Sequence, residues 1–188
     1  MPTFTLDTNC FIAIDDGREE SQYVMALAKQ EKHEVALLAS SASERQLGGS
    51  HLESFDEFTT RMKKMEIGHL KTILPIAKWG LCFWGFAIYA TAEQCERETL
   101  IFQTLFPTFP ASWQEYAKDQ GIDGDDLQHG KAWKWRNRLC DAQAFWSHEH
   151  AGYDIFVTTD KNFRKKLVGH AAFPGAVVMT PKEAVATL

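Results

Sequence analysis

Short apolar runs alternate along the chain with longer segments of helical periodicity. The runs of strand length occupy residues 4–6, 35–39, 70–76, 154–158 and 176–179. The second run is apolar throughout, as expected for a strand that is covered on both faces. The third contains Pro75, which lacks a backbone donor and therefore favours the edge of a sheet. This alternation predicts an α/β protein with a parallel sheet and helices on both faces.

The helical segments have recognisable stripes and starts. Residues 52–65 repeat Leu, Phe and Met at helical spacing, which is typical of a face packed into a core. Residues 126–150 predict a long helix whose buried stripe borders Asp141. Ser43 and Gln46 have the spacing of a capping box, which would place Glu44 in the first turn of a further helix.

Composition describes one folded domain. The chain has 188 residues, of which 45% are hydrophobic, and this is enough to fill a core. We expect a single domain over 1–188 with a helical, Trp-rich insertion at about 78–125. The four cysteines lack metal-ligand spacing, no secretory segment precedes the first strand, and the apolar run in the insertion is too short to span a membrane. A cytoplasmic protein with reduced thiols, not associated with a membrane, is the expectation.

The net charge of −5 argues against a protein that coats nucleic acid without specificity. Local basic clusters nevertheless occur at 131–138 and 161–166. Such clusters are often solvated helix faces. Because both flank acidic positions, they are also candidates for contacts with a phosphate backbone. The candidate nucleic-acid-binding residues are Lys134, Arg138, Lys161 and Arg164.

Four acidic residues carry the candidate chemistry. Asp7 and Asp160 each follow a predicted strand, Glu44 follows another, and Asp141 lies within the long helix. The carboxyl ends of parallel strands open onto one crevice, where several carboxylates would repel one another unless a cation lay between them. Oxygen ligands select Mg²⁺ or Mn²⁺, and paired cations of this kind hydrolyse phosphodiesters.

Each acid also has a simpler interpretation. Asp7 could form an Asx turn after its strand, and Asp160 could cap a helix. Glu44 in a first helical turn would interact favourably with the helix dipole. Asp141 is different, because an acid beside an apolar stripe is costly to bury unless it is paired or bound to a cation.

The motifs LDTN at 6–9 and TTDKNF at 158–163, with the two acids between them, resemble the PIN-domain ribonucleases. The resemblance covers residues 1–56 and about 126–188. It implies a three-layer α/β/α sandwich around a parallel sheet of about five strands. It also implies that Asp7, Glu44, Asp141 and Asp160 are the catalytic and metal-binding acids. Supporting polar groups would be Thr8 or Asn9 after the first strand and Thr158 or Thr159 before the fourth acid.

The resemblance implies hydrolysis of RNA phosphodiesters with Mg²⁺ or Mn²⁺, in the manner of the toxin of a toxin–antitoxin pair or of a related stand-alone PIN protein. Implied partners are the RNA substrate, an antitoxin that inserts a basic side chain into the acidic pocket, and a second copy of the chain. The alternative is a catalytically silent PIN-like module that binds nucleic acid or acts as a scaffold.

Other candidate chemistry is weaker. His148, Glu149 and His150 could hold a transition metal, although a polar helix end is more often surface. Cys140 could act as a nucleophile, but a small core residue is the better interpretation in a helix interior. A haloacid-dehalogenase-type phosphatase would have a second Asp two residues after Asp7, where this chain has Asn9.

Overall fold

A computed structural model describes residues 1–44 and 52–188. Five strands form one sheet in which every pairing is parallel, with the order β3-β2-β1-β4-β5. The strands are β1 (Phe4–Leu6), β2 (Val35–Leu38), β3 (Lys71–Ile73), β4 (Ile155–Val157) and β5 (Val178–Met179). Each lies within a predicted apolar run, and β3 lies at an edge of the sheet, as Pro75 indicated.

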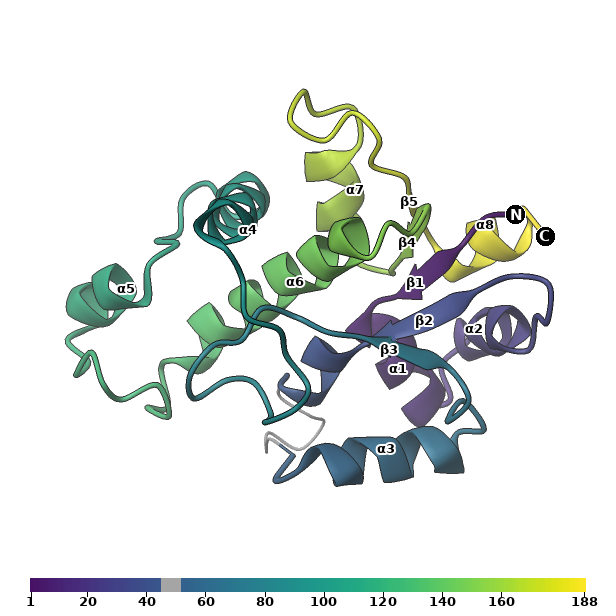
Figure 1. Cartoon of the computed structure of the whole chain (residues 1–188), viewed down its shortest axis with the longest axis horizontal. Helices are drawn as coiled ribbons and strands as arrows, with labels where there is room; N and C mark the ends of the chain where they lie inside the picture. Colours follow the sequence, from purple (N-terminus) through teal and green to yellow (C-terminus); the bar gives the residue numbers. More distant parts are fainter. Residues whose placement is uncertain (45–51) are drawn as a thin grey trace.

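Alternate residues of each central strand enter different cores. Along β2, Val35 and Leu37 belong to one apolar cluster, whereas Ala36 and Leu38 belong to the other. Successive side chains of a strand point to opposite faces, so the sheet separates two packed layers. The protein therefore has the three-layer α/β/α architecture that the sequence and the PIN resemblance predict, as Figure 1 shows.

One layer consists of helices from the two ends of the chain. These are α1 (Thr8–Asp15), α2 (Ser21–Ala28), α3 (Phe55–Lys64) and α8 (Pro181–Val185). Helix α2 packs against both α1 and α8. Ser54 caps α3 by accepting from the backbone of Glu57, and Phe55, Phe58 and Met62 are buried. The Phe/Met stripe is thus core, as predicted from its spacing.

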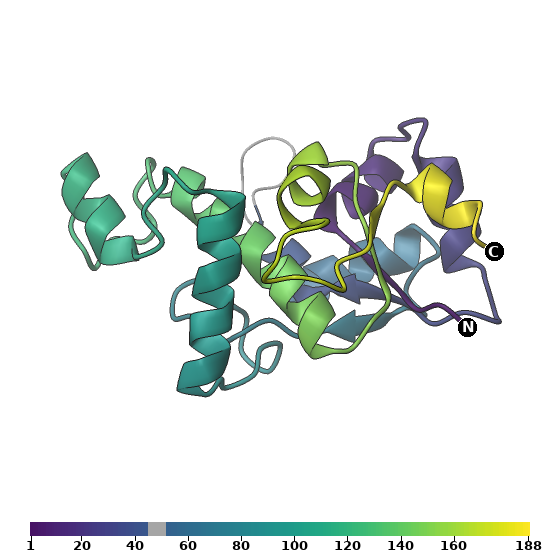
Figure 2. The same cartoon turned by 90° about the horizontal axis from the view of Figure 1, so that it is seen from above.

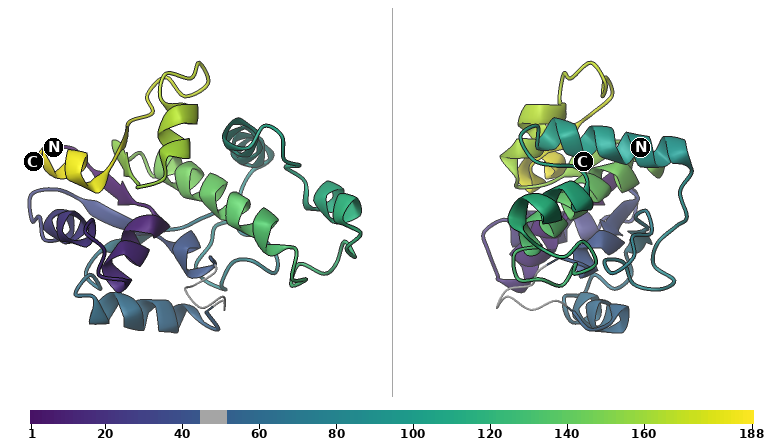
Figure 3. Two further views of the ribbon diagram at one scale, coloured as in Figure 1. Left: turned by 180° about the vertical axis from the view of Figure 1, so that it is seen from behind. Right: turned by 90° about the vertical axis from the view of Figure 1, so that its left-hand side faces the viewer.

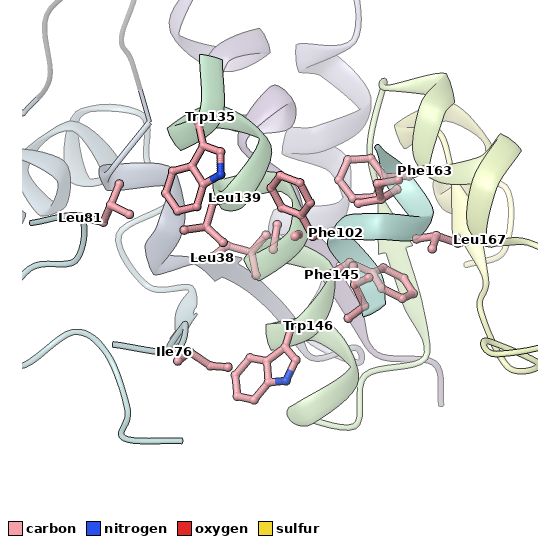
Figure 4. Packing of buried hydrophobic residues seen from close by; sticks show 14 of the residues in the cluster. Leu38, Ile76, Leu81, Phe102, Trp135, Leu139, Phe145, Trp146, Phe163 and Leu167 are labelled. Atoms are coloured by element: carbon pink, nitrogen blue, oxygen red, sulfur yellow. The ribbon is translucent and has the colours of Figure 1, made fainter. Parts of the chain in front are cut away.

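The opposite layer contains α4 (Ala92–Leu105), α6 (Trp133–His150) and α7 (Lys161–Leu167), with α4 packed against the other two. Aromatic side chains fill this core; Figure 4 shows Phe102, Phe145 and Phe163 between these helices, with Trp135 near the start of α6 and Trp146 near its end. Helix α5 (Trp113–Gln120) extends this layer away from the sheet, as Figures 1 and 2 show. The two termini lie together at the opposite end of the molecule, as Figure 3 shows.

The structure differs from the sequence prediction at the start of α6 and after β2. Helix α6 begins at Trp133 rather than near residue 126, because consecutive turns containing Gly124 and Gly130 occupy residues 123–132. A 3₁₀ helix, η1 (Ala39–Ala42), follows β2, and Glu44 lies just beyond it. Gln46, the second residue of the predicted capping box, lies outside the described residues, so a helix there remains a prediction.

The Trp-rich segment is only partly helical. It contains α4 and α5, whereas residues 78–91 form an irregular loop. The status of 78–125 as an insertion into a single PIN-like domain remains a prediction. In the part of the chain that the structure describes, no helix has the length and apolar character needed to cross a membrane.

Candidate active site

The first acid, Asp7, lies at the carboxyl end of the central strand β1 and is 1% exposed. Its backbone N–H still bonds to Val157 of β4, so the sheet holds it in place. Its Oδ2 accepts from Thr158 Oγ1 at 2.7 Å and from Asn9 Nδ2 at 3.0 Å. Asp7 occupies the N-cap position of α1 without a side-chain capping bond, so capping does not explain this carboxylate.

The second acid, Glu44, is oriented by a chain of hydroxyl groups. Thr8 Oγ1 donates to Glu44 Oε1 and lies 2.7 Å from Ser41 Oγ. Since the Thr8 hydroxyl has a single proton, Ser41 is then the donor to Thr8. Ser41 was not identified from the sequence; the hydroxyl-rich stretch 40–43 was the available signal.

The third acid, Asp141, lies in the middle of α6 and is half-buried between the buried residues Cys140 and Ala142. No hydrogen bond or ion pair reaches its carboxylate within residues 1–44 and 52–188. Burial raises the pKa of Asp141 well above its ordinary value, and the nearby charges of Glu44, Asp7 and Asp160 raise it further. Asp141 is therefore not a carboxylate stabilised by a structural ion pair.

The fourth acid, Asp160, caps α7. Its Oδ1 accepts from the backbone N–H of Asn162 at 2.8 Å, as the simpler interpretation of this residue predicted. Thr158 Oγ1 accepts from the backbone N–H of Asp160 and donates to Asp7. Thr158 thus connects two of the acids, whereas Thr159 is half-buried beside them.

The four carboxylates influence one another electrically. Burial raises the pKa of Asp7, and the charge of Asp160 raises it further against the opposing hydrogen bond from Thr158. Burial, together with the charge of Asp7, raises the pKa of Glu44 from 4.5 to about 8. Segments from four different parts of the chain therefore bring acids into mutual electrostatic range at the carboxyl edge of the sheet.

These residues suit a hard divalent cation in chemistry and in charge. All supply oxygen ligands, and a cation would relieve both the repulsion and the burial cost that raise the pKa values of Asp7, Glu44 and Asp141. In residues 1–44 and 52–188, no three acidic, histidine or cysteine side chains converge on a point that could enclose a metal ion. The structure thus brings the four acids into one neighbourhood without drawing three of them to a common centre.

The predicted phosphate contacts differ in their surroundings. Arg138 lies over the rings of Phe109 and Phe106, with its guanidinium carbon 4.0 and 5.5 Å from their centroids, and its charge lowers the pKa of Asp141. Lys134 is exposed and lies over Trp133. The charge that a basic side chain offers to a phosphate depends on whether an acidic partner within the protein already neutralises it.

On α7, the two predicted phosphate contacts also differ. Lys161 is exposed at the first position of the helix. Arg164 forms an exposed ion pair with Glu183 of α8 at 2.9 Å. The charge of Arg164 is therefore partly satisfied inside the protein, whereas Lys161 presents its ammonium to solvent.

The other candidate groups have structural surroundings. His148 is buried and bonds to Thr5 Oγ1 at 3.1 Å, so the expectation of a surface position is wrong for this residue. Glu149 pairs with Arg97, and His150 stacks on the ring of Trp146. Cys140 is buried, and burial raises its pKa well above the ordinary thiol value, which suits a core residue rather than a nucleophile. All four cysteines are free thiols.

The fold and site together define a class: a three-layer α/β protein with an all-parallel sheet and a group of carboxylates at its carboxyl edge. No protein-family model and no curated protein matches the chain. Among solved structures, the chain is similar to one described as VapBC2 from Rickettsia felis bound to a DNA fragment from their promoter. The identity is 15% and the TM-score 0.41, with 95% of this chain and 98% of that chain covered.

Proposed function

We propose that this protein is a PIN-type endoribonuclease that hydrolyses RNA phosphodiester bonds with Mg²⁺ or Mn²⁺. The observation that carries the proposal is the electrostatic coupling of acids from four separate segments: burial and neighbouring carboxylates raise the pKa values of Asp7, Glu44 and Asp141, and the charge of Asp160 contributes to the shifts of Asp7 and Asp141. Buried like charges of this kind are costly, and they cluster at functional sites. The resemblance to the PIN family supports the same four residues, since Asp7 stands in LDTN, Asp160 stands in TTDKNF, and Glu44 and Asp141 are the acids that the resemblance assigns between these motifs.

In this proposal, Asp7, Glu44 and Asp141 hold the principal cation, and Asp160 shapes a second site or orients the attacking water. A bound divalent cation would lower the pKa of water and neutralise charge that develops on the phosphate. Thr158 and Asn9 fix the carboxylate of Asp7, and Thr8 fixes that of Glu44.

Phosphate binding in the proposal involves the basic residues beside the crevice. Arg138 lies one helical turn before Asp141, and two phenylalanine rings restrict its guanidinium. A planar guanidinium with limited freedom is well suited to a phosphate, because it donates two parallel hydrogen bonds. Lys134 and Lys161 would attract the RNA backbone on either side.

The test is cleavage of a panel of single-stranded and structured RNAs by the purified protein, with Mn²⁺ or with EDTA. We expect cleavage only with the metal and its loss in Asp141→Asn. The matched control is Asp119→Asn, which makes the same chemical change at an exposed position on α5. Cleavage that survives EDTA, or that survives Asp141→Asn, would contradict the proposal.

A second candidate is a PIN-like module that binds nucleic acid or acts as a scaffold without catalysis. One observation favours it: no three metal-binding side chains in residues 1–44 and 52–188 converge on a common point. A calorimetric titration with Mn²⁺ separates the two candidates. Binding in the parent that weakens in Asp141→Asn supports the nuclease, whereas absence of binding at millimolar Mn²⁺ supports the silent module.

We also propose that the nuclease serves as the toxin of a toxin–antitoxin pair. A basic side chain of the antitoxin would complement the carboxylates of the crevice, whose repulsion it would relieve. Induced expression in a bacterial host should arrest growth, and Asp141→Asn should abolish the arrest at equal protein level. Growth arrest that persists in the variant would contradict this role. Light scattering on the purified protein tests the homodimer, which a monomer at high concentration would exclude.

A further inference from the structure

Three exposed aromatic rings lie together on the loop that follows β3. Trp79, Trp84 and Tyr89 are 84%, 82% and 91% exposed, and the Trp79 and Trp84 rings meet edge to face with centroids 6.2 Å apart. They line a cleft of about 780 Å³, which we call the aromatic cleft; Lys78, Phe83 and Cys95 contribute to its walls. Exposure of this much aromatic surface is unfavourable in water, so the rings require an explanation.

The loop that bears the aromatic cleft is firmly attached at its base. Ala77 N–H donates to the Ile88 carbonyl and Ile88 N–H to the Pro75 carbonyl, which closes the loop on itself. Gly80 and Gly85 have positive φ values of 74° and 81°, which allow its tight turns. Internal bonds therefore define the path of the main chain.

Side chains of the same loop also anchor it to the core. The ring of Phe86 stacks on Phe55 of α3 with centroids 3.5 Å apart, and Leu81 is buried. Glu98 of α4, which is 3% exposed, holds the Lys78 ammonium at 2.6 Å. Side chains that point inward fix the loop, so the outward rings form a pre-organised surface rather than a mobile one.

The charges around the aromatic cleft differ from those of the other hollows. Its lining within the described residues contains Lys78 and no carboxylate. The hollow beside α1 and α3 has two acids, Asp15 and Glu66, balanced by Arg61 and Lys64, and the hollow between α4 and α6 has three glutamates against the single Arg97. In a chain of net charge −5, the aromatic cleft is therefore compatible with a polyanion. The ring surfaces would supply most of the binding, because Glu98 already neutralises the charge of Lys78.

The loop that bears the aromatic cleft lies at the same edge of the sheet as the four acids. Cys82, on the wall of the cleft, is close enough to Cys140 to influence the ionisation of that thiol, and Cys140 responds in the same way to Glu44 and Asp141. The loop leaves the sheet at the carboxyl end of β3, the same edge at which β1 and β4 deliver Asp7 and Asp160. The rings and the acids therefore lie on the same side of the molecule with respect to the sheet.

We infer that the aromatic cleft binds unpaired nucleobases of an RNA strand next to the acidic crevice, by stacking them on Trp79, Trp84 and Tyr89. Aromatic rings beside a nucleic-acid path bind bases of any identity, since every base has a π face. The inference rests on the proposed nuclease function for its choice of RNA, and it restricts the substrate to single-stranded segments. Base-paired RNA keeps its bases stacked internally and cannot use the cleft.

The experiment measures binding in EDTA, which keeps it independent of metal and of cleavage. Fluorescence anisotropy is recorded with a labelled ten-nucleotide single-stranded RNA, with the same RNA annealed to its complement, and with a version lacking the bases but keeping the ribose phosphates. The variants are Trp79→Ala, Trp84→Ala and the conservative Trp84→Phe. Val168→Ala, which trims an exposed apolar side chain outside the cleft, is the control.

Each alanine variant should bind the single strand about 5- to 100-fold more weakly, whereas Trp84→Phe and Val168→Ala should bind within about twofold of the parent. The variants and the parent should have equal affinities for the duplex, and equal affinities for the strand that lacks bases. The loss should have the same factor at low and at moderate salt, because stacking releases no counterions. Unaltered melting temperatures would show that the fold is retained.

Equal binding of the single strand by the parent and the alanine variants overturns the inference, and so does an absence of RNA binding in EDTA. If the parent is a dimer, and Trp84→Ala makes it monomeric without changing its affinity for RNA, the cleft would instead be the binding site for a second copy of the chain. Failure of the two proposals is distinguishable. If the alanine variants bind and cleave RNA with Mn²⁺ as well as the parent does, only the base-binding inference is refuted. If the alanine variants bind RNA more weakly but neither they nor the parent cleave it, only the nuclease proposal is refuted.

Discussion

Substitution of Glu44 by Gln should stabilise the protein at neutral pH in EDTA. In the folded protein, burial and the charge of Asp7 raise the pKa of Glu44 from 4.5 to about 8, so at pH 7 its carboxyl group is mostly protonated. In the unfolded chain the same group is ionised. Folding must therefore bind a proton at this position, which costs free energy, whereas Gln has no proton to bind and can still accept from Thr8.

The size of this effect depends on pH in a defined way. At pH 7, the difference between the ordinary pKa and the raised value corresponds to roughly 3 kcal/mol of lost stability, at 1.36 kcal/mol for each pKa unit. Between the two pKa values the folded state holds more protons than the unfolded state, so stability falls as the pH rises. Near pH 4 both states of Glu44 are protonated, and the gain from Gln should vanish.

Urea denaturation of the parent and of Glu44→Gln between pH 4 and pH 7.5 in EDTA measures this gain directly. Titrating groups away from the crevice contribute equally to both proteins and cancel in the difference, whereas loss of the Glu44 charge also relieves Asp141 and Asp7 and adds to the gain. Glu31→Gln, at an exposed position, controls for the general effect of removing a negative charge. The reasoning is wrong if Glu44→Gln is less stable than the parent at pH 7, or if its gain does not change with pH.

Three further predictions concern the same molecule. Mn²⁺ at a hundredfold excess over its dissociation constant should stabilise the parent by about 2.7 kcal/mol. Thermal melts should show a much smaller stabilisation of Asp141→Asn by Mn²⁺, and equal stabilisation of the two proteins would exclude Asp141 as a ligand. Burial lowers the pKa of His148 from 6.5 to about 4, so stability should fall by about 3 kcal/mol as the pH drops through this window, and His148→Gln should remove that slope in urea titrations. Phe102→Ala, on the buried face of α4, should cost about 3–5 kcal/mol of unfolding free energy; a loss below 1 kcal/mol would mean that the core repacks.

The strands could be predicted because their signal is local. A run such as 35–38 is apolar at every position, and only a strand covered on both faces needs that pattern. The start of α6 could not be placed in the same way. Asp125 and Asp126 are good residues for a helix start, but two glycines nearby favour turns, and the sequence does not show which preference prevails.

The position of a side chain relative to the surface depends on tertiary contacts that periodicity does not report. His148 follows an apolar stripe at a polar helix end, yet it is buried because Thr5 of the central strand supplies a hydrogen bond 143 residues away. Residues 78–91 were expected to be helical on composition, whereas Pro75, Gly80 and Gly85 favour the irregular loop that is observed. Composition identified their aromatic content but could not show which rings point outward.

Structural and catalytic interpretations of an acid need not compete. Asp160 caps α7 through Oδ1, and within residues 1–44 and 52–188 its Oδ2 takes no hydrogen bond, so one carboxylate can fix its own orientation and still present an oxygen to the crevice. Thr8 fixes the orientation of Glu44 through Oε1. An acid held in this way loses little further side-chain freedom when it binds a cation. For the proposed nuclease, the capping bond of Asp160 is therefore a means of positioning the carboxylate, and its presence is no argument against a role for Asp160 in the site.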